Sequence, residues 1–422
     1  MKELPLFNGI TAEMTLFDGI IIKLQNMLRL FFIGLSCAMV SCLVAIFLNP
    51  IVVKLAYDKH LVDAPNYRKL QKVPVPVLGG MSVYLAVVVG IMLCNYFVPV
   101  NGMSLPMSAL TIMFYVGLFD DLIGLSARRK FFFQILVVFL MWCFGFRVDT
   151  LLGVFGIWYI PESWSFVLSM FTGVGLMNAI NLIDGVDGLA SGGGIIMCSL
   201  MAIFFIRHAD FVYAVFAVVF VGSLIPFFFC NVFSRKFKMF IGDSGSLMLG
   251  TVSYLFIVRW LHSAPLFPLD AYGVSCLVAI YAVPVFDTLR VMGVRILKKT
   301  SPFKADKTHL HHIFVDLGLP HFIVTTIILF MSVLIIVISY LFSLIKWHPT
   351  YQLLAVVASS ALIVWGTYFV LRIIRDNHPD LFISMKARLK LRMRKPIKFY
   401  HWAQELCDGH TRRRRRNLKL KR

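Results

Sequence analysis

Five aspartates lie where apolar segments of the 422-residue chain end: Asp120, Asp121, Asp184, Asp187 and Asp243. An Asp at the centre of a membrane helix costs roughly 2.5–3.5 kcal/mol on insertion scales. The cost is smaller near the interface, yet five acids in three short segments call for more than scattered interfacial solvation. Carboxylate oxygens are the ligands that Mg²⁺ prefers. The pattern therefore indicates a divalent-cation site assembled from separate segments.

The densest polar pattern runs from position 178 to position 188, and its polar side chains recur every third residue: Asn178, Asn181, Asp184 and Asp187. On a helix, this spacing forms one inclined polar stripe on an apolar body. Gly185 and Gly188 remove side-chain bulk beside the carboxylates, so that backbone can approach a ligand closely. The structural alternative is a polar helix–helix contact that ends in glycines.

Basic residues accompany the other acids. They are Arg128, Arg129 and Lys130 after Asp120-Asp121; Arg235, Lys236 and Lys238 before Gly242-Asp243; and Lys304, His309, His311 and His312 in a later segment. An acidic cluster alone would repel a nucleotide diphosphate, whereas a dication between them reverses the sign of that interaction. Basic side chains then neutralise the remaining phosphate charge. Together these patterns predict metal-assisted phosphoryl transfer at a membrane surface.

The three histidines also allow a zinc site, but they do not form the H-E-x-x-H pattern and no second Cys or His motif joins them. Contacts to phosphate or sugar are the favoured interpretation, with a purely structural role for one of the three as an alternative.

The elements that must position these residues are membrane helices. Hydrophobic residues make up 59% of the chain and charged residues 15%, against about 25% charged in soluble domains. Because a helix needs roughly 20 apolar residues to cross a bilayer, we expect an all-α polytopic membrane protein with about eleven transmembrane helices. The expected spans are 28–56, 76–98, 105–119, 131–146, 164–183, 189–206, 211–230, 247–261, 273–297, 322–345 and 353–374.

Charge predicts the orientation of these helices. With the C-terminal tail inside, the inner loops hold fourteen Lys and Arg and the outer loops hold three, as the positive-inside rule requires. We expect a periplasmic extension at 1–27, a catalytic membrane domain at 28–375 with cytoplasmic catalytic loops, and a basic cytoplasmic tail at 376–422. The tail carries a net charge of +11, which is typical of a surface near anionic lipid. Nucleic-acid binding is not expected, because no nucleic-acid-binding fold accompanies the basic run.

Several ordered motifs resemble those of the polyprenyl-phosphate N-acetylhexosamine-1-phosphate transferases, the glycosyltransferase 4 family. They are Val62-Asp63-Ala64-Pro65-Asn66-Tyr67-Arg68-Lys69, Pro76-Val77-Leu78-Gly79-Gly80, Asp120-Asp121, the block from Asn181 to Asp187, Gly242-Asp243, and His309-Leu310-His311-His312. The resemblance covers residues 62–375. The histidine block looks like that of the branch which transfers GlcNAc-1-phosphate to undecaprenyl phosphate.

The resemblance implies the reaction UDP-GlcNAc plus undecaprenyl phosphate to undecaprenyl-diphospho-GlcNAc plus UMP, with Mg²⁺ or Mn²⁺. This would be the first lipid-linked step of O-antigen, enterobacterial common antigen or a related polysaccharide, in the bacterial inner membrane with the active site cytoplasmic. Transfer of phospho-MurNAc-pentapeptide or another hexosamine-1-phosphate to the same lipid is the alternative. A homodimer is a further expectation.

By motif, the resemblance makes Asp243 the first metal ligand, with Asp120 and Asp121 as further ligands or as the base that acts on the lipid phosphate. Asp184 and Asp187 would border the nucleotide, and Phe240 would stack on uracil. The remaining expected substrate contacts are Arg68, Lys72, Asn181, Lys304, His309, His311 and His312.

Two other classes and a rival route remain open. An intramembrane aspartyl protease also uses paired acids, but its G-x-G-D motif fails because Phe240 occupies the first glycine position. A carboxylate-relay transporter explains the acids but not their confinement to one face beside glycines and histidines. For the transferase, direct attack by the lipid phosphate on the β-phosphorus competes with a two-step route through a phospho-aspartate.

Overall fold

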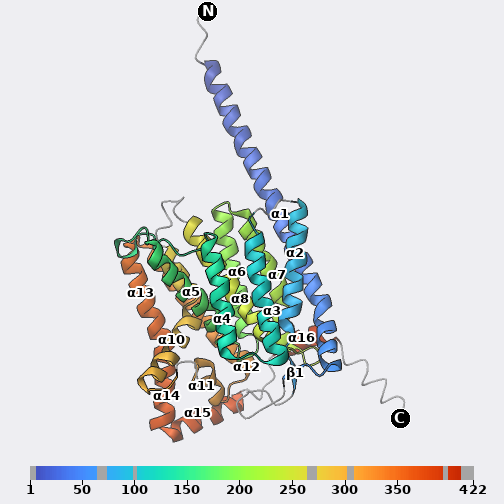
Figure 1. The fold of residues 1–422 in the computed structure, drawn as a ribbon, viewed down its shortest axis with the longest axis vertical. Helices are drawn as coiled ribbons and strands as arrows, with labels where there is room; N and C mark the ends of the chain where they lie inside the picture. The colour runs from blue at the N-terminus through green and yellow to red at the C-terminus, as the bar shows by residue number, and fades with distance from the viewer. Residues whose placement is uncertain are drawn as a thin grey trace, which may run out of the picture.

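The computed structural model describes residues 6–63, 74–97, 102–263, 273–301, 308–392 and 398–409, with side chains from Leu28 onward. Helices dominate this part of the chain (Figure 1). In chain order they are α1 Leu6–Asp58, α2 Gly79–Phe97, α3 Ser104–Ile123, α4 Ala127–Cys143, α5 Glu162–Ile183, α6 Leu189–Arg207, α7 Phe211–Phe233, α8 Gly242–Ser263, α9 Gly273–Ile280, α10 Ala282–Leu297, α11 Leu310–Asp316, α12 His321–Leu344, α13 Pro349–Ala361, α14 Thr367–Asn377, α15 Pro379–Arg392 and α16 Lys398–Asp408. A short 3-10 helix, η1, covers Val154–Gly156, and a π-helical turn, η4, covers Leu362–Gly366. Two short strands, β1 (Val62–Asp63) and β2 (Val75–Pro76), pair antiparallel.

The all-α polytopic prediction is confirmed, with a lower count of spans. Nine helices in the described ranges are long and apolar enough to cross a membrane, and α9 with α10 makes a tenth if the bent pair is one span. The predicted span 131–146 forms α4, which has 17 residues. At 1.5 Å per residue, α4 is only about 26 Å long, somewhat shorter than the hydrocarbon core.

The expected span 273–297 consists of two helices, α9 and α10, which meet at a bend of 69°. Pro284 explains where the break falls. Proline has no N–H to donate four residues back, and its ring clashes with the carbonyl at that position. That carbonyl belongs to Ile280, the last residue of α9.

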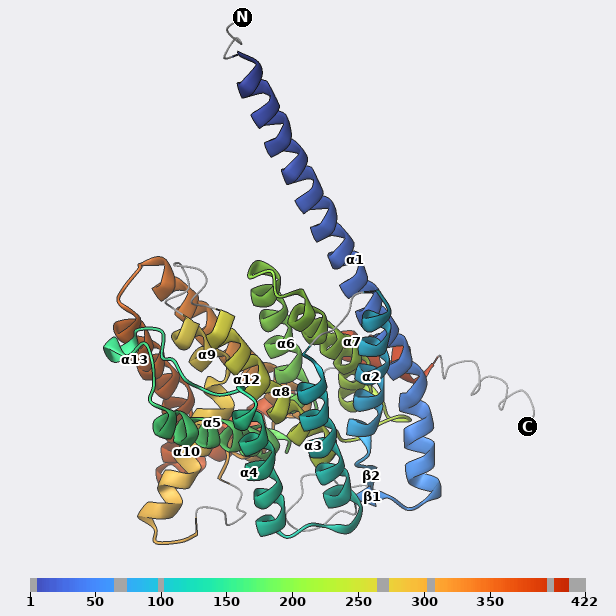
Figure 2. The same ribbon diagram turned by 45° about the horizontal axis from the view of Figure 1, so that its top comes forward.

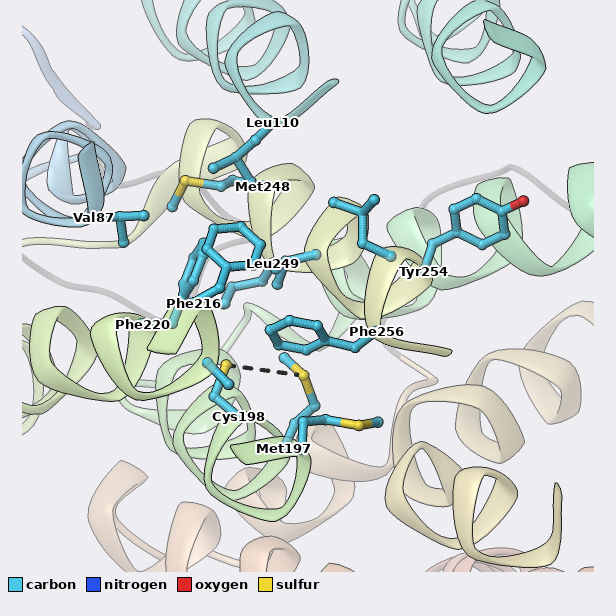
Figure 3. Close-up of a cluster of buried hydrophobic side chains, with 14 of the residues drawn as sticks. Val87, Leu110, Met197, Cys198, Phe216, Phe220, Met248, Leu249, Tyr254 and Phe256 are labelled. Carbon is cyan, nitrogen blue, oxygen red and sulfur yellow. Dashed lines mark hydrogen bonds between the residues drawn. The ribbon is translucent and has the colours of Figure 1, made fainter. Parts of the chain in front are cut away.

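Helix α8 forms the centre of the bundle. Almost all of its side chains are buried, and it packs against α3 and α5. Phe216 and Phe220 of α7 meet Leu249 and Phe256 of α8 in the core (Figure 3). Helix α1, by contrast, is mostly exposed along its apolar length, as expected for a helix that faces lipid. Its N-terminal part projects from the end of the bundle opposite to β1 (Figure 1).

Two groups of helices flank this centre. Helices α1, α2 and α7 pack together on one side, and α9, α12 and α13 pack together on the other (Figure 2). A second hydrophobic cluster, separate from the main core, holds the latter group together. Segments from the α1, α2 and α7 group and from the α9, α12 and α13 group both end at the side of the bundle where β1 lies.

Candidate active site

A cavity of about 530 Å³ opens at the end of the bundle where β1 lies. It collects the ends of segments that are far apart in sequence. Its lining comprises His60, Leu61, Val62, Val77, Asp120, Asp121, Leu122, Asp184, Gly185, Val186, Asp187, Asn231, Phe240, Gly242, Asp243, His312 and His321. All five predicted aspartates and Phe240 thus meet in one cavity, as the sequence patterns predicted.

The first turn of α8 is held from α3. The Asp121 carboxylate accepts the backbone N–H of Asp243 at 2.8 Å and of Ser244 at 3.0 Å. These N–H groups have no partner within their own helix, and an anion is favourable at this end of the helix dipole. Gly117 lets α3 come this close, because a Cβ there would lie 2.4 Å from the Asp243 carbonyl oxygen. Asp121 therefore positions Asp243.

Lys130 joins two of the acids. Its ammonium forms ion pairs with Asp120 and, at 2.6 Å, with Asp243. Asn181 donates from Nδ2 to the other Asp243 oxygen at 2.6 Å and to Ser246 Oγ at 2.8 Å. The Asp243 side chain is therefore held by α4 and α5, and its backbone N–H by α3. Asn181 supports Asp243 and is absent from the cavity lining, whereas it was expected to contact substrate.

The predicted polar stripe is not a single helical surface. Helix α5 ends at Ile183, so that Asn178 and Asn181 lie on the helix, while Asp184 and Asp187 lie in the turn that follows. The Asp184 carboxylate has no hydrogen-bond or ion-pair partner among the described residues. Burial, together with the charges of Asp243 and Asp121, raises the pKa of Asp184 well above its usual range. Ionisation of Asp184 would therefore add a negative charge that no described side chain pairs with.

Asp187 has a different environment. It accepts from Lys238 Nζ at 2.6 Å and contacts His321 Nδ1 at 3.0 Å. Burial alone would raise its pKa, but the His321 hydrogen bond and the Lys238 charge outweigh burial and lower the pKa of Asp187. Its second oxygen, Oδ1, is buried without a partner in the described part of the chain.

The glycines beside the acids serve the protein's own packing. A Cβ on Gly185 would lie 2.6 Å from His311 Nε2. Gly188 has φ +79° and donates its N–H to Asn231 Oδ1 at 2.5 Å. Asn231 also donates from Nδ2 to the Met239 carbonyl at 2.7 Å, so one side chain ties the Asp184–Asp187 turn to the segment that leads to Phe240.

The three predicted histidines occupy three environments. His309 Nδ1 contacts Asp287 at 2.9 Å, and Asp287 also pairs with Arg290 at 2.6 Å. His311 is buried, and burial with the neighbouring His312 and His309 lowers its pKa well below the usual range. Only His312 of the three lines the cavity. His309 and His311 therefore form the support beneath His312, whereas all three were expected to contact substrate.

Three further expected contacts, Arg68, Lys72 and Lys304, lie outside the described residues. Three residues that line the cavity, His321, Asn231 and His60, were not predicted from the sequence. Lys130, one of the basic residues noted after Asp120-Asp121, joins two of the acids. Asn231 is a polar residue near the end of an apolar helix, and this position could have indicated a site residue. His321 follows Pro320 at the start of an apolar helix, and nothing in its sequence context indicated a site residue.

The donor chemistry fits a hard divalent cation. Four carboxylates besides Asp121 face the cavity, one of them unpaired and one with an orphaned oxygen, and oxygen ligands suit Mg²⁺ or Mn²⁺. No group of three acidic, His or Cys side chains is already arranged as a metal cluster within the described ranges. Lys130 occupies the space between Asp120 and Asp243, so that a cation at Asp243 would have to replace that ammonium.

Known proteins are similar to this chain in sequence. The sequence profile of glycosyl transferase family 4 matches residues 103–261, which include Asp120, Asp121, Asp184, Asp187 and Asp243. The chain is 31% identical over 342 residues to a probable undecaprenyl-phosphate N-acetylglucosaminyl 1-phosphate transferase of Bacillus subtilis, covering 79% of this chain and 87% of the relative.

Two more relatives agree. An undecaprenyl-phosphate alpha-N-acetylglucosaminyl 1-phosphate transferase of Yersinia pestis is 28% identical, with 82% of this chain and 93% of the relative covered. A decaprenyl-phosphate N-acetylglucosaminephosphotransferase of Mycobacterium leprae is 31% identical, with 68% and 77% covered. With the acids gathered in one cavity of a membrane bundle, these matches show that the chain belongs to glycosyl transferase family 4, the polyprenyl-phosphate N-acetylhexosamine-1-phosphate transferases.

Proposed function

We propose that the protein transfers GlcNAc-1-phosphate from UDP-GlcNAc to undecaprenyl phosphate and releases UMP. The observation that carries the proposal is the single cavity at one end of the membrane bundle, where carboxylates, His312 and Phe240 converge. A soluble anionic donor can enter such a cavity from water, and a lipid phosphate can reach it from the bilayer surface. The names of the relatives support the choice of donor sugar and acceptor lipid.

We place this cavity on the cytoplasmic side of the bacterial inner membrane. Support comes from the loops that form it, because they carry most of the Lys and Arg residues between spans. We assign the reaction to the first lipid-linked step of a surface polysaccharide such as O-antigen or enterobacterial common antigen.

In the proposed reaction, an oxygen of the lipid phosphate attacks the β-phosphorus of the sugar nucleotide. The new phosphorus–oxygen bond forms as the bond to the bridging oxygen breaks, and UMP leaves with that oxygen. Phosphate has its second pKa near 6, so the nucleophile is already largely ionised at neutral pH. General-base catalysis is therefore unnecessary, and the protein's task is to hold the two phosphates in line and to stabilise charge.

Different residues of the chain hold the phosphates and stabilise the charge. Lys130, Lys238, His312 and His321 bring basic groups to the acidic cavity. Phe240 supplies an apolar face for the uracil ring. Asp243 is the proposed first metal ligand, with Asp120 and Asp184 beside it, while Asp121 is engaged in holding α8. Bound Mg²⁺ or Mn²⁺ would supply neutralisation of diphosphate charge.

UMP release from the full-length protein in nanodiscs, with UDP-GlcNAc and undecaprenyl phosphate, tests the function. We expect release that requires both substrates, stops with EDTA and returns with excess Mg²⁺. Asp243→Asn should abolish release in a folded protein. Asp149→Asn is the matched control, because Asp149 belongs to an ion-paired cluster with His262 and Arg147 away from the cavity. Near-normal turnover of Asp243→Asn would remove this residue from the proposed site.

A further inference from the structure

The C-terminal helix α16 packs against the cavity-side end of α7. Tyr400, Ala403 and Cys407 recur at helical spacing and form its inner face. Tyr400 donates its hydroxyl to the Val232 carbonyl at 3.3 Å. Ala403 is fully buried. Helix α16 is therefore packed against α7.

Asp408, at the end of α16, binds the turn that follows α7. Its carboxylate accepts the Ser234 hydroxyl at 2.5 Å and the backbone N–H groups of Arg235 and Lys236 at 3.1 and 3.2 Å. This turn continues to Lys238, which pairs with Asp187, and to Phe240 in the cavity lining. One carboxylate on α16 therefore holds the start of a segment that supplies the candidate site.

The neighbouring face of α16 is apolar and largely exposed, although the Phe399 ring also packs edge-on against Phe233 of α7. Phe399, Trp402 and Leu406 are 49%, 56% and 63% exposed. Their i, i+3 and i+7 spacing places them in one stripe, directly beside the stripe that contacts α7. Because α16 packs against the end of α7, a candidate membrane span, the open stripe lies at the level where that span ends.

The basic residues near this stripe favour an anionic partner. Lys398 begins α16, and residues 409–422 contain eight Lys and Arg with no acidic residue. An apolar stripe with aromatic residues beside a basic run is typical of a helix that lies in the interface of an anionic membrane. A protein partner would need no such excess of positive charge.

We propose that α16 is an anchor for anionic lipid headgroups, in which Phe399, Trp402 and Leu406 enter the membrane interface while Asp408 fixes the segment leading to Lys238 and Phe240. Anionic lipid at the anchor would then favour the arrangement of the cavity. The link to turnover rests on the proposed function, whereas the membrane position of Trp402 does not.

Tryptophan quenching tests the anchor without any activity. The full-length protein and its Trp402→Phe variant are placed in nanodiscs of phosphatidylglycerol or of phosphatidylcholine, with and without brominated acyl chains. We expect the difference signal, which reports Trp402, to lose most of its intensity in brominated phosphatidylglycerol and much less in brominated phosphatidylcholine. Replacing Arg412–Arg416 with Gln should reduce the quenching of Trp402 in brominated phosphatidylglycerol to the level seen in brominated phosphatidylcholine.

Two results would overturn the anchor. Equal quenching in both lipids would show that the stripe inserts without regard to headgroup charge. No quenching in either lipid would show that the face is covered by protein, such as a second copy, or remains in water.

Turnover in the two lipids tests the coupling. Wild type should be several-fold faster in phosphatidylglycerol, and Asp408→Asn should lose this difference while keeping Trp402 quenching. Asp376→Asn, which changes an exposed ion-paired Asp outside α16, should keep it. An unchanged lipid ratio in Asp408→Asn would refute the coupling, whereas no turnover in any lipid would instead refute the proposed function.

Discussion

The carboxylate of Asp121 on α3 accepts the backbone N–H of Asp243, the second residue of α8, at 2.8 Å. An acid from one span thus acts as the N-terminal cap of another. The cap matters for function because the same turn presents the Asp243 side chain to the cavity. Asp120 and Asp121 are neighbours in sequence but have different roles: Asp120 pairs with Lys130, and Asp121 orients a helix.

Replacing this cap should separate stability from activity. In Asp121→Asn the amide can accept one N–H but cannot accept both, so we expect a loss of about 1 kcal/mol in stability and a much larger loss of UMP release. The control is Asp210→Asn, because Asp210 accepts the Tyr213 N–H at the start of α7, outside the cavity lining. The control should lose stability only. Equal activity losses in the two variants would contradict the positioning role.

Lys130 should compete with the metal. Because its ammonium occupies the space between Asp120 and Asp243, Lys130→Gln should lower the Mg²⁺ concentration needed for half-maximal turnover. The same change removes a positive charge from the phosphates, so kcat should fall on the order of a hundredfold. Arg129→Gln, which changes an exposed neighbour, should alter neither value. A Mg²⁺ titration that gives the same half-saturation for Lys130→Gln and wild type would argue against competition.

A methyl group on Gly185 should disturb the histidine support. The added Cβ would lie 2.6 Å from His311 Nε2, and such overpacking costs about 1–3 kcal/mol. We expect Gly185→Ala to reduce UMP release strongly, because His311 underlies His312. In Gly175→Ala the new Cβ meets nothing within 4 Å, and this variant should retain wild-type release. Full activity of Gly185→Ala would show that His311 can shift without consequence.

The ionised Asp184 carboxylate should destabilise the folded state of the metal-free protein. Its raised pKa means that the fold disfavours the ionised form, so the cost is present at pH values above the raised pKa. It vanishes below about pH 4, where the carboxyl is protonated in the folded and unfolded states alike. Asp184→Asn in EDTA should therefore melt at a higher temperature than wild type at pH 8, with a difference that shrinks as the pH falls. A lower melting temperature at pH 8 would contradict this assignment.

The sequence predicted the membrane helices and the gathering of the five acids, because apolar length and charge asymmetry are local signals. The three-residue spacing suggested one helical stripe that continues through Asp184 and Asp187, whereas hydropathy placed the end of this span at residue 183, where α5 does end. The Asp287 partner that occupies His309 lies 22 residues away in sequence, and nothing in the spacing reveals such a contact.

Long-range contacts explain the other differences in the same way. The roles of Asn231 and His321 depend on partners 43 and 134 residues distant. The break between α9 and α10 was readable from Pro284. Hydropathy alone did not reveal it, because both halves are apolar.

In the proposed reaction, one phosphorus atom moves from the nucleotide to the lipid in the cavity around Asp243. Wild-type protein in nanodiscs with undecaprenyl phosphate and UDP-GlcNAc carrying ³²P in the β-phosphate tests it directly. We expect the label to enter the organic phase as a lipid diphosphate while unlabelled UMP accumulates, and we expect Asp243→Asn to transfer none. Label that stays in water as UDP while the sugar reaches the lipid would contradict it.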